Sequence, residues 1–346
     1  MNDRLFFIIS GEHPTLPAAE LRAILEAESC QFHIVDSTPK LLLVDAPRSC
    51  IEPVSTRSSM CTISGYHILE SSNDRPSIQK AIKQNDLSNI LRPGDTFSVR
   101  VVKTGTTQHR KNSATLEAYV GGIVNETVKD VSVNLVKPDK PLVGIMSDEK
   151  FVLGLEKYRR EPGGFARRRP RKRPVFHPST MPPKLALCML NLARPRRGDI
   201  VLDPFCGVGG ILIESSLVGY RTIGCDILLQ KVQDSLLNMN FFGLEPFGMV
   251  LADARSPPFQ KVNAIVTDPP YGTLASTHGS TAKEVFSEFL KAANEMVSHG
   301  GCICLGAPEK LEVESLGREA DLELVERHKV YIHRSLTREI AVFRRR

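Results

Sequence analysis

Short apolar runs alternate with longer amphipathic stretches along most of this chain of 346 residues. Apolar runs bounded by turn residues indicate buried strands, and apolar positions recurring at helical spacing indicate the helices that cover them. In the first part of the chain the pattern predicts a strand from Arg4, a helix over 17–28 with Thr15 as its N-cap, and two short strands. We therefore expect an α+β region at the start of the chain.

The remaining chain continues this alternation. The predicted elements of the middle part are strands at 60–69 and 96–103, helices at 77–89 and 113–124, and two closing strands before residue 155. From Pro174 onward strands alternate regularly with helices, which predicts an α/β fold with a parallel sheet covered on both faces. The last two strands, 328–333 and 338–343, are close enough in sequence to form an antiparallel hairpin that closes this sheet.

The composition is that of an ordinary globular protein. Hydrophobic residues make up 41% and charged residues 24% of a chain long enough for several domains. No apolar run is long enough to span a membrane, and the first residues lack the shape of a secretory signal. Eight cysteines occur without a C-x-x-C pair, which favours reduced thiols in the cytoplasm over disulfides or a zinc site. We expect no metal.

Basic residues are concentrated in one segment. Residues 157–174 hold nine Lys or Arg and one acid, a net charge of +8 in a chain whose total is +6. Prolines and glycines at 162–164 and Pro170 exclude a continuous helix, so we expect an extended linker between domains. It is either simply solvated or in contact with phosphate groups, and the arginines favour phosphate because a guanidinium pairs well with it.

The motif Asp268-Pro269-Pro270-Tyr271 follows an apolar run over 262–267 that predicts a buried strand. The two prolines end the strand and stiffen the loop. The Asp268 carboxylate and the loop carbonyls can accept hydrogen bonds from one amino group, while Tyr271 offers a ring for stacking. These features are typical of a holder for the exocyclic amine of a nucleobase, although so short a motif also occurs by chance.

A second motif, Asp203-Pro204-Phe205-Cys206-Gly207-Val208-Gly209-Gly210, joins a short apolar strand to a helix. Glycines at such a turn let the backbone approach a ligand closely. The spacing differs from that of dinucleotide-binding and P-loop motifs, and Asp203 can anchor the ammonium group of an amino-acid-like ligand. Asp226, 19 residues beyond Gly207 and at the end of the next strand, suits the hydroxyls of a ribose.

A third strand, 248–252, leads to Asp253, which is placed to meet an adenine amino group. Each aspartate taken singly is better explained as a solvated strand end than as a ligand-binding residue. Together, three aspartates at the carboxyl ends of parallel strands predict a site for an amino acid joined to adenosine.

These motifs, in this order along the chain, resemble those of the class I S-adenosylmethionine-dependent amino-methyltransferases. Within that class the chain is similar to the tRNA guanine N2-methyltransferases that carry a THUMP domain, in particular the archaeal and eukaryotic tRNA guanosine-10 N2-methyltransferases. The resemblance includes residues 96–155, which are similar to a THUMP domain, and 176–186, which are similar to a segment that helps to cover the cofactor. It implies S-adenosylmethionine as cofactor and tRNA as partner.

The resemblance also implies an order of domains. These are a ferredoxin-like α+β region at 1–50, a THUMP RNA-binding domain at 51–156, the basic linker at 157–174 and a Rossmann-like methyltransferase domain at 175–346. The sheet of the last domain is expected to be mostly parallel, with the antiparallel hairpin at its C-terminal end.

The motifs and the resemblance together define the candidate site residues. The catalytic ones are Asp268, Pro269, Pro270 and Tyr271. Those expected to bind the cofactor are His177, Thr180, Met181, Asp203, Pro204, Cys206, Gly207, Gly209, Asp226, Ile227, Asp253, Ala254 and Asp268. Those expected to bind RNA are Lys103, His109, Arg110, Lys111, Arg159, Arg160, Arg167, Arg168, Arg169, Arg171, Lys172 and Arg173, although a solvated face also carries scattered basic residues.

The expected chemistry is a methyl transfer to nitrogen. An exocyclic amine is a weak nucleophile because its lone pair is delocalised into the ring, and hydrogen bonds to Asp268 and the Pro269 carbonyl would aim that lone pair outward. Holding amine and methyl group in line contributes on the order of 7–11 kcal/mol. We expect Asp268 mainly to orient the amine, since a carboxylate with a pKa of about 4 is a weak base. Tyr271 would stack on a base that has left its helical stack.

In this fold the strand that leads to Asp253 lies at the edge of the sheet, and its segment Phe247–Leu251 is unusually apolar. Natural proteins normally blunt such edges with charge or proline. We therefore expect a partner to add a strand here, as a small zinc-binding activator does in relatives from eukaryotes and some archaea.

Other interpretations stay open at this point. The same chemistry could serve another tRNA position, ribosomal RNA, or adenine or cytosine in DNA, and the THUMP-like region argues against DNA. A non-catalytic RNA-binding subunit would be expected to lack Asp268 or the glycine loop, and both are present. Thiouridine synthases also use a THUMP domain, but the chain has no adenylating loop of the expected kind. Whether one or two methyl groups are added depends on whether the pocket accepts a monomethylated amine.

Overall fold

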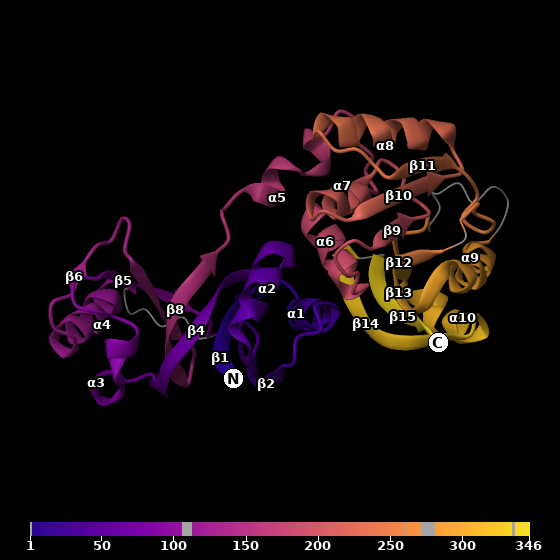
Figure 1. Ribbon diagram of the computed structural model, residues 1–346. Helices are drawn as coiled ribbons and strands as arrows, with labels where there is room; N and C mark the ends of the chain where they lie inside the picture. The colour runs from indigo at the N-terminus through magenta and orange to yellow at the C-terminus, as the bar shows by residue number, and fades with distance from the viewer. Residues whose placement is uncertain (1, 106–112, 260, 271–280, 334–335) are drawn as a thin grey trace. The chain divides into compact units, whose positions relative to one another are not determined.

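The computed structural model of the protein describes residues 2–105, 113–259, 261–270, 281–333 and 336–346. Its contacts divide the chain into two compact units (Figure 1). Unit 1 comprises Met1–Pro14, Cys30–Ser55 and Cys61–Arg160, and unit 2 comprises Thr15–Ser29, Thr56–Met60 and Glu161–Arg346. The division into three domains and a linker stays a prediction.

Unit 1 is built on one sheet of eight strands, in the order β2-β3-β1-β4-β8-β7-β5-β6. The strands are β1 (Asp3–Ile9), β2 (His33–Thr38), β3 (Leu41–Ala46), β4 (Cys61–Ser72), β5 (Thr96–Lys103), β6 (Ser132–Val133), β7 (Lys140–Met146) and β8 (Lys150–Arg159). The helices between them are α2 (Ile51–Arg57), α3 (Arg75–Gln84) and α4 (Ser113–Thr127), with 3-10 turns η1 (Arg48–Cys50) and η2 (Leu87–Asn89). Helix α4 packs on β5, and helix α3 packs on β4 and α4. The buried apolar cluster between them includes Ile78, Val99 and Val120.

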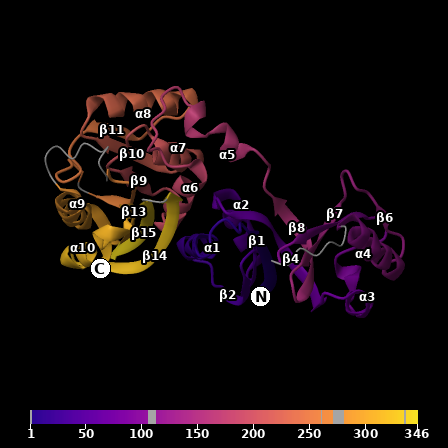
Figure 2. The same ribbon diagram turned by 180° about the vertical axis from the view of Figure 1, so that it is seen from behind.

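Unit 2 contains a sheet of seven strands in the order β11-β10-β9-β12-β13-β15-β14 (Figure 2). These are β9 (Ile200–Asp203), β10 (Arg221–Asp226), β11 (Gly248–Leu251), β12 (Val262–Thr267), β13 (Val297–Pro308), β14 (Leu322–His333) and β15 (Leu336–Arg345). Strands β9 to β13 run parallel to one another, and β15 is antiparallel to both β13 and β14. The predicted parallel sheet closed by an antiparallel hairpin is confirmed.

Helices cover both faces of this second sheet. They are α1 (Leu16–Ala27), α5 (Gly164–Arg167), α6 (Pro183–Leu192), α7 (Gly210–Leu217), α8 (Leu229–Phe241), α9 (Ala282–Met296) and α10 (Val313–Glu319), with 3-10 turns η3 (Pro170–Lys172) and η4 (Glu309–Leu311). Successive strand residues point to opposite faces. Val201 therefore packs in the core with α1, α6 and α7, whereas Leu202 packs in the core with α9 and α10.

Helix α1 precedes β2 in sequence, yet it packs in unit 2 against α6. A buried polar network holds it there. The carboxylate of the fully buried Glu20 accepts hydrogen bonds from the backbone N–H groups of Ser59 and Met60 and from the side chain of Asn191. Thr15 occupies the predicted N-cap position, but its hydroxyl makes no cap hydrogen bond and instead contacts Nδ1 of His328 at 2.8 Å.

Two other predictions need adjustment. The helix predicted over 77–89 ends at Gln84, because Asn85 is extended and the Asp86 side chain caps a separate 3-10 turn by accepting from the Ser88 N–H. The basic segment is not fully extended, since α5 and η3 form two short helical turns within it. Pro170 begins the second turn, so the exclusion of a continuous helix is confirmed.

All eight cysteines are free thiols, and Cys302 and Cys304 lie buried in β13 as expected of core residues. No helix in the described ranges is long and apolar enough to cross a lipid bilayer. Among the same residues, no group of His, Cys, Asp and Glu side chains is arranged to hold a metal ion.

Candidate functional site

The candidate residues meet at the carboxyl ends of the parallel strands of unit 2. Asp203 ends β9 and Asp226 ends β10, while Asp268 follows the last residue of β12. Strands β9 and β12 are neighbours at the point where the strand order reverses. Open α/β sheets bind their ligands in the crevice at such a point, so the topology brings together motifs that lie more than sixty residues apart.

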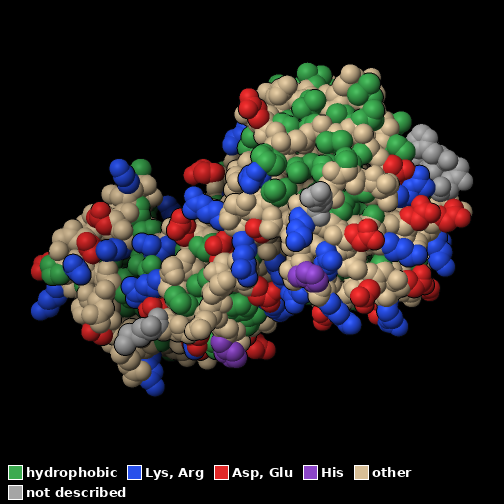
Figure 3. Space-filling view, turned by 45° about the vertical axis from the view of Figure 1, so that its right-hand side comes forward, with side chains coloured by type: hydrophobic (Ala, Val, Ile, Leu, Met, Phe, Trp, Pro, Cys, Tyr) green, Lys and Arg blue, Asp and Glu red, His purple; other side chains and the backbone are tan. Residues whose placement is uncertain are grey.

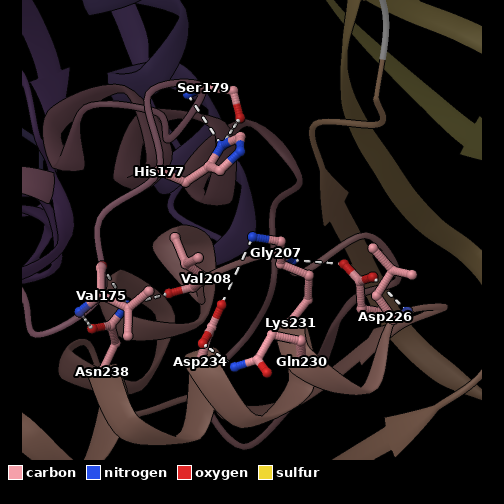
Figure 4. Close-up of polar contacts among 11 residues, drawn as sticks. Val175, His177, Ser179, Gly207, Val208, Asp226, Gln230, Lys231, Asp234 and Asn238 are labelled. Atoms are coloured by element: carbon pink, nitrogen blue, oxygen red, sulfur yellow. Dashed lines mark hydrogen bonds and ion pairs between the residues drawn. The ribbon is translucent and has the colours of Figure 1, made fainter. Parts of the chain in front are cut away.

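The glycine loop between β9 and α7 requires its glycines. Gly207 and Gly209 have φ values of +52° and +81°, in the left-handed region that a side chain disfavours. A Cβ on Gly209 would also lie 2.5 Å from the Ser235 hydroxyl of α8. The Gly207 N–H donates to Oδ2 of Asp226 at 3.0 Å (Figure 4), which ties the loop to the end of β10.

Asp203 is a buried acid that lacks a cation among the described residues. It is 2% exposed, and its Oδ1 accepts hydrogen bonds from the Thr267 hydroxyl at 2.7 Å and the Phe205 N–H at 3.2 Å. Burial raises the pKa of Asp203 to about 7, because removing water disfavours the charged carboxylate. A ligand ammonium group would supply the missing positive charge, which fits the predicted role of this residue.

The other two strand-end acids already have partners. Both oxygens of Asp226 accept backbone hydrogen bonds, from Gly207 and from Leu228. The Asp253 carboxylate forms an ion pair with Arg255 at 2.6 Å, a contact that the sequence analysis did not foresee. A carboxylate has room for about four hydrogen bonds, so ligand hydroxyl groups can join the two contacts of Asp226. Each oxygen of Asp253 already accepts twice from Arg255, so a ligand amine there would have to replace one of these contacts.

Asp268 is held from two sides by strands of the C-terminal part of the sheet. Its Oδ2 forms an ion pair at 2.9 Å with Nη2 of Arg338, a buried residue of β15. A Cβ on Gly306 of β13 would lie 2.3 Å from its Oδ1, so only glycine leaves space for this carboxylate. Pro269 is buried and Pro270 half-buried, whereas Tyr271 lies outside the described residues.

Sequence reasoning missed Arg338 and Gly306. One signal for Arg338 was available, because an arginine in a strand of the sheet needs an acidic partner when it is buried. The sequence does not say which acid that is, since Asp268 belongs to a different strand. No sequence signal pointed to Gly306, whose importance depends on the position of a side chain from a neighbouring strand.

The segment that precedes α6 packs beside the glycine loop. The buried Asn238 of α8 accepts from the Val175 N–H and donates to the carbonyls of Val175 and Val208. Figure 4 shows this bridge below the loop, with His177 above it in contact with Ser179 at 2.7 Å. Sequence reasoning did not identify Asn238, although a polar residue on the buried face of a helix is a signal for such a bridge.

The remaining predicted cofactor residues differ in exposure. Met181, Pro204, Cys206 and Ala254 are buried, Thr180 is half-buried, and His177 and Ile227 are exposed. Burial raises the pKa of the Cys206 thiol well above its usual range, so this thiol has no nucleophilic character.

The predicted RNA-binding residues also differ. Lys103, Arg159, Arg167, Arg169, Arg171 and Lys172 have exposed side chains and Arg160 is half-buried, whereas His109, Arg110 and Lys111 lie outside the described residues. Arg168 forms an ion pair at 2.7 Å with the buried Glu214 of α7. The side chain of Arg173 is 5% exposed and does not face solvent in this structure.

Comparison with known proteins finds similarity over the whole chain. The family described as "RMKL-like, methyltransferase domain" matches residues 170–340, and one described as "DNA methylase" matches residues 94–236. The tRNA (guanine(10)-N2)-dimethyltransferase of Methanothermobacter thermautotrophicus is 38% identical over 347 residues, 99% of each chain. The enzyme of the same name from Methanocaldococcus jannaschii is 32% identical, over 98% of this chain and 99% of its own.

Solved structures show the same fold at low sequence identity. TrmN from Thermus thermophilus has a TM-score of 0.54 and 20% identity, covering 99% of this chain and 100% of its own. SMU.472, which was solved in complex with SAH, has a TM-score of 0.53 and 13% identity, covering 100% of this chain and 98% of its own. At these identities the likeness concerns the fold alone, and it confirms the predicted α/β methyltransferase fold.

The buried Asp203 predicts a dependence of stability on pH. Its carboxyl titrates at 3.8 when unfolded and at about 7 when folded, so this group stabilises the fold below the lower value and the contribution is lost as the pH rises through about 7. Asp203→Asn can keep both hydrogen bonds, since both end on Oδ1. As the pH rises over that range, we expect the free energy of unfolding of the variant to increase relative to that of the wild type, by up to about 1.4 kcal/mol per pH unit. Urea denaturation of both proteins at several pH values across the range would measure this difference. If the free energy of unfolding of the two proteins varied with pH in the same way, the prediction would be contradicted.

Proposed function

Because this chain belongs to the family of the tRNA (guanine(10)-N2)-dimethyltransferases, we propose that it transfers methyl groups from S-adenosylmethionine to the N2 amine of guanosine 10 in tRNA. It is a tRNA guanine N2-methyltransferase that depends on S-adenosylmethionine. The position in the tRNA and the addition of two methyl groups are the proposed part. The observation that carries the proposal is the setting of Asp268, whose carboxylate is fixed at the topological switch point beside the cofactor loop.

The cofactor residues fit an amino acid joined to adenosine. S-adenosylmethionine supplies a methyl group activated by its sulfonium when it is bound. Asp203 would pair with its ammonium group, which offsets the cost of a buried carboxylate that has no cation. Asp226 would accept from the ribose hydroxyls, and Asp253 would accept from the adenine amine. The glycine loop lets the backbone approach the ligand between these contacts.

Asp268 would bind the guanine amine in the orientation that reaction requires. Its carboxylate accepts an amine N–H, so the nitrogen lone pair points away from the base and toward the methyl carbon. The new N–C bond forms as the S–C bond breaks, and the positive charge that develops on nitrogen lies next to the carboxylate. The surplus proton then leaves the nitrogen to solvent or to Asp268. The ion pair with Arg338 holds the Asp268 carboxylate in one orientation, which favours a positioning role.

The exposed basic residues of the linker and of β5 are proposed to contact the tRNA backbone. They are Lys103, Arg159, Arg167, Arg169, Arg171 and Lys172. Phosphate contacts of this kind supply affinity and register but do not select the base. We propose that residues 51–156 form the THUMP domain and that the enzyme acts in the cytoplasm.

We further propose that a small zinc-binding protein covers β11 by adding a strand. Strand β11 is the last of its sheet and pairs with β10 alone within the described sheet. Hydrophobic side chains gather over this part of unit 2, at the top of Figure 3. Several apolar residues there are more than half exposed, namely Leu229, Leu237 and Phe241 of α8 together with Phe247 and Leu251. Contiguous apolar surface of this kind marks a protein interface, and a strand edge offers unpaired backbone groups to a partner.

The function is tested on unmodified tRNA transcripts with labelled S-adenosylmethionine, followed by nucleoside analysis. We expect N2-methylguanosine to appear first and N2,N2-dimethylguanosine later, and no product from a transcript with adenosine at position 10. Asp268→Asn should lower the rate by about 100-fold or more, since the amide no longer balances the developing charge. Product from the adenosine-10 transcript would contradict the proposed position.

Gly306 provides a second test of how Asp268 is held. Gly306→Ala places a methyl group 2.3 Å from Oδ1 of Asp268, so the carboxylate must move. We expect methyl transfer to fall by about 100-fold, with binding of S-adenosylhomocysteine measured by calorimetry unchanged. Gly122→Ala is the matched control, because a Cβ there meets nothing within 4 Å. Loss of cofactor binding together with activity would show instead that Gly306 supports the fold of the whole site.

The edge-strand proposal is tested with Leu251→Lys, which places a charge on β11 without removing a core residue. We expect the wild-type chain to self-associate when produced alone and to become monodisperse when produced with the zinc-binding partner. The variant should stay dispersed alone but fail to bind that partner by size-exclusion chromatography. Val136→Lys in unit 1, at a side chain 95% exposed, is the control and should still bind. A dispersed, fully active wild-type chain without a partner would refute the idea.

A further inference from the structure

Arg173 stands apart from the other residues of the basic segment. Its charge and position in the sequence grouped it with the residues expected to contact RNA, yet its side chain is 5% exposed. The turn η3 directs the chain inward at this point, since the Arg173 N–H donates to the Pro170 carbonyl. Nε of Arg173 donates to the Arg168 carbonyl at 3.1 Å. The guanidinium of Arg173 is therefore not presented on the surface of the segment, where an RNA backbone would contact it.

The outer end of this guanidinium is unsatisfied. Nη1 and Nη2 of Arg173 are both buried, and neither has a hydrogen-bond partner among the described residues. Glu214 is the nearby acid that attracts the charge of Arg173, but both of its oxygens already accept from Arg168, at 2.9 and 2.7 Å. Two arginines therefore share one buried acid, which leaves one positive charge without a counterion. Burying such a charge is costly unless a ligand pairs with it.

Arg173 and Thr180 both lie against the start of α7. Nη1 of Arg173 lies 3.6 Å from the place that a Cβ on Gly210 would take, and Cγ2 of Thr180 lies 3.3 Å from the same place. The Thr180 hydroxyl is also buried and has no partner in the described part of the chain. Gly210 is the first residue of α7, directly after the glycine loop. The N-terminal end of a helix adds further positive potential, so this point suits an anion.

The two ends of the glycine loop thus lie beside buried groups of opposite charge, each without a counterion in the described part of the chain. At residue 203 the loop begins with a buried acid that lacks a cation, and at Gly210 it ends beside a buried cation that lacks an anion. The amino-acid end of S-adenosylmethionine carries both an ammonium and a carboxylate on one carbon atom. We propose that Arg173, together with the Thr180 hydroxyl, binds the α-carboxylate of S-adenosylmethionine. This inference rests on the cofactor of the proposed function and removes Arg173 from the residues that contact RNA.

The test compares two ligands that differ only in the carboxylate. These are S-adenosylhomocysteine and its decarboxylated analogue, and calorimetry measures the Kd of each. We expect the wild type to bind S-adenosylhomocysteine at least about tenfold more tightly, as a charged hydrogen bond contributes that much. Arg173→Met should remove this preference by raising the Kd for S-adenosylhomocysteine about tenfold or more, with the Kd for the analogue unchanged. Equal weakening of both ligands, or no change in either, would overturn the proposal.

Control variants separate this role from folding and from RNA binding. Arg171→Met changes an exposed arginine of the same segment and should leave both Kd values unchanged. Thr180→Val removes one hydroxyl at nearly constant volume and should weaken S-adenosylhomocysteine alone, which provides the test if Arg173→Met does not fold. Arg173→Met should also leave the affinity of the cofactor-free protein for tRNA unchanged. A fall in that affinity with unchanged cofactor binding would return Arg173 to the RNA contacts and overturn the proposal.

The outcome of these binding measurements does not depend on which nucleotide of the tRNA is methylated. Failure of the wild type to bind S-adenosylhomocysteine at all would contradict the proposed function itself. Binding without preference for the carboxylate would contradict only the role given to Arg173.

Discussion

The need to give every acid at the carboxyl edge of the sheet a partner governs the structure of the site. A parallel sheet brings the ends of its strands together, and in this chain four of those ends carry aspartate. Like charges this close would destabilise one another unless each were paired or bound to a hydrogen-bond donor. Asp226 uses backbone N–H groups, while Asp253 and Asp268 use arginines. Asp203 and Asp226 both depend on neutral donors, and Asp203 is the one of the two that is buried, which leaves its charge to be balanced by the ligand.

The C-terminal hairpin therefore does more than close the sheet. Strand β15 brings Arg338 to the carboxylate of the catalytic motif, and its neighbour β13 leaves the required space by placing a glycine there. The orientation of Asp268 thus depends on two buried residues of the sheet, Arg338 and Gly306. A carboxylate held in this way loses little entropy when an amine binds, which is the condition for effective positioning.

At the cofactor end of the site the buried charges are positive, and they too require partners of opposite charge. Arg168 and Arg173 enter unit 2 from the basic segment, where sequence alone suggests only solvent or phosphate. Because both side chains are at least partly buried, their roles differ from those that the sequence suggests. One becomes the partner of Glu214, and the other keeps a charge that is available to an anion. A cluster of basic residues next to a site is thus not uniformly an RNA surface, and the exposure of each side chain decides its role.

The sequence by itself determined what depends on neighbours in the chain. Alternation of apolar runs predicted the strands, the glycine loop predicted a ligand site, and acids just after apolar runs predicted the edge where they meet. Bounds of β5 and β12 follow directly from local composition. Only the tertiary structure decided which distant residues pair: Arg338 with Asp268, α1 with α6, and Arg173 with the start of α7. The physical reason is that pairing and burial depend on distance in space, which the order of residues along the chain does not specify.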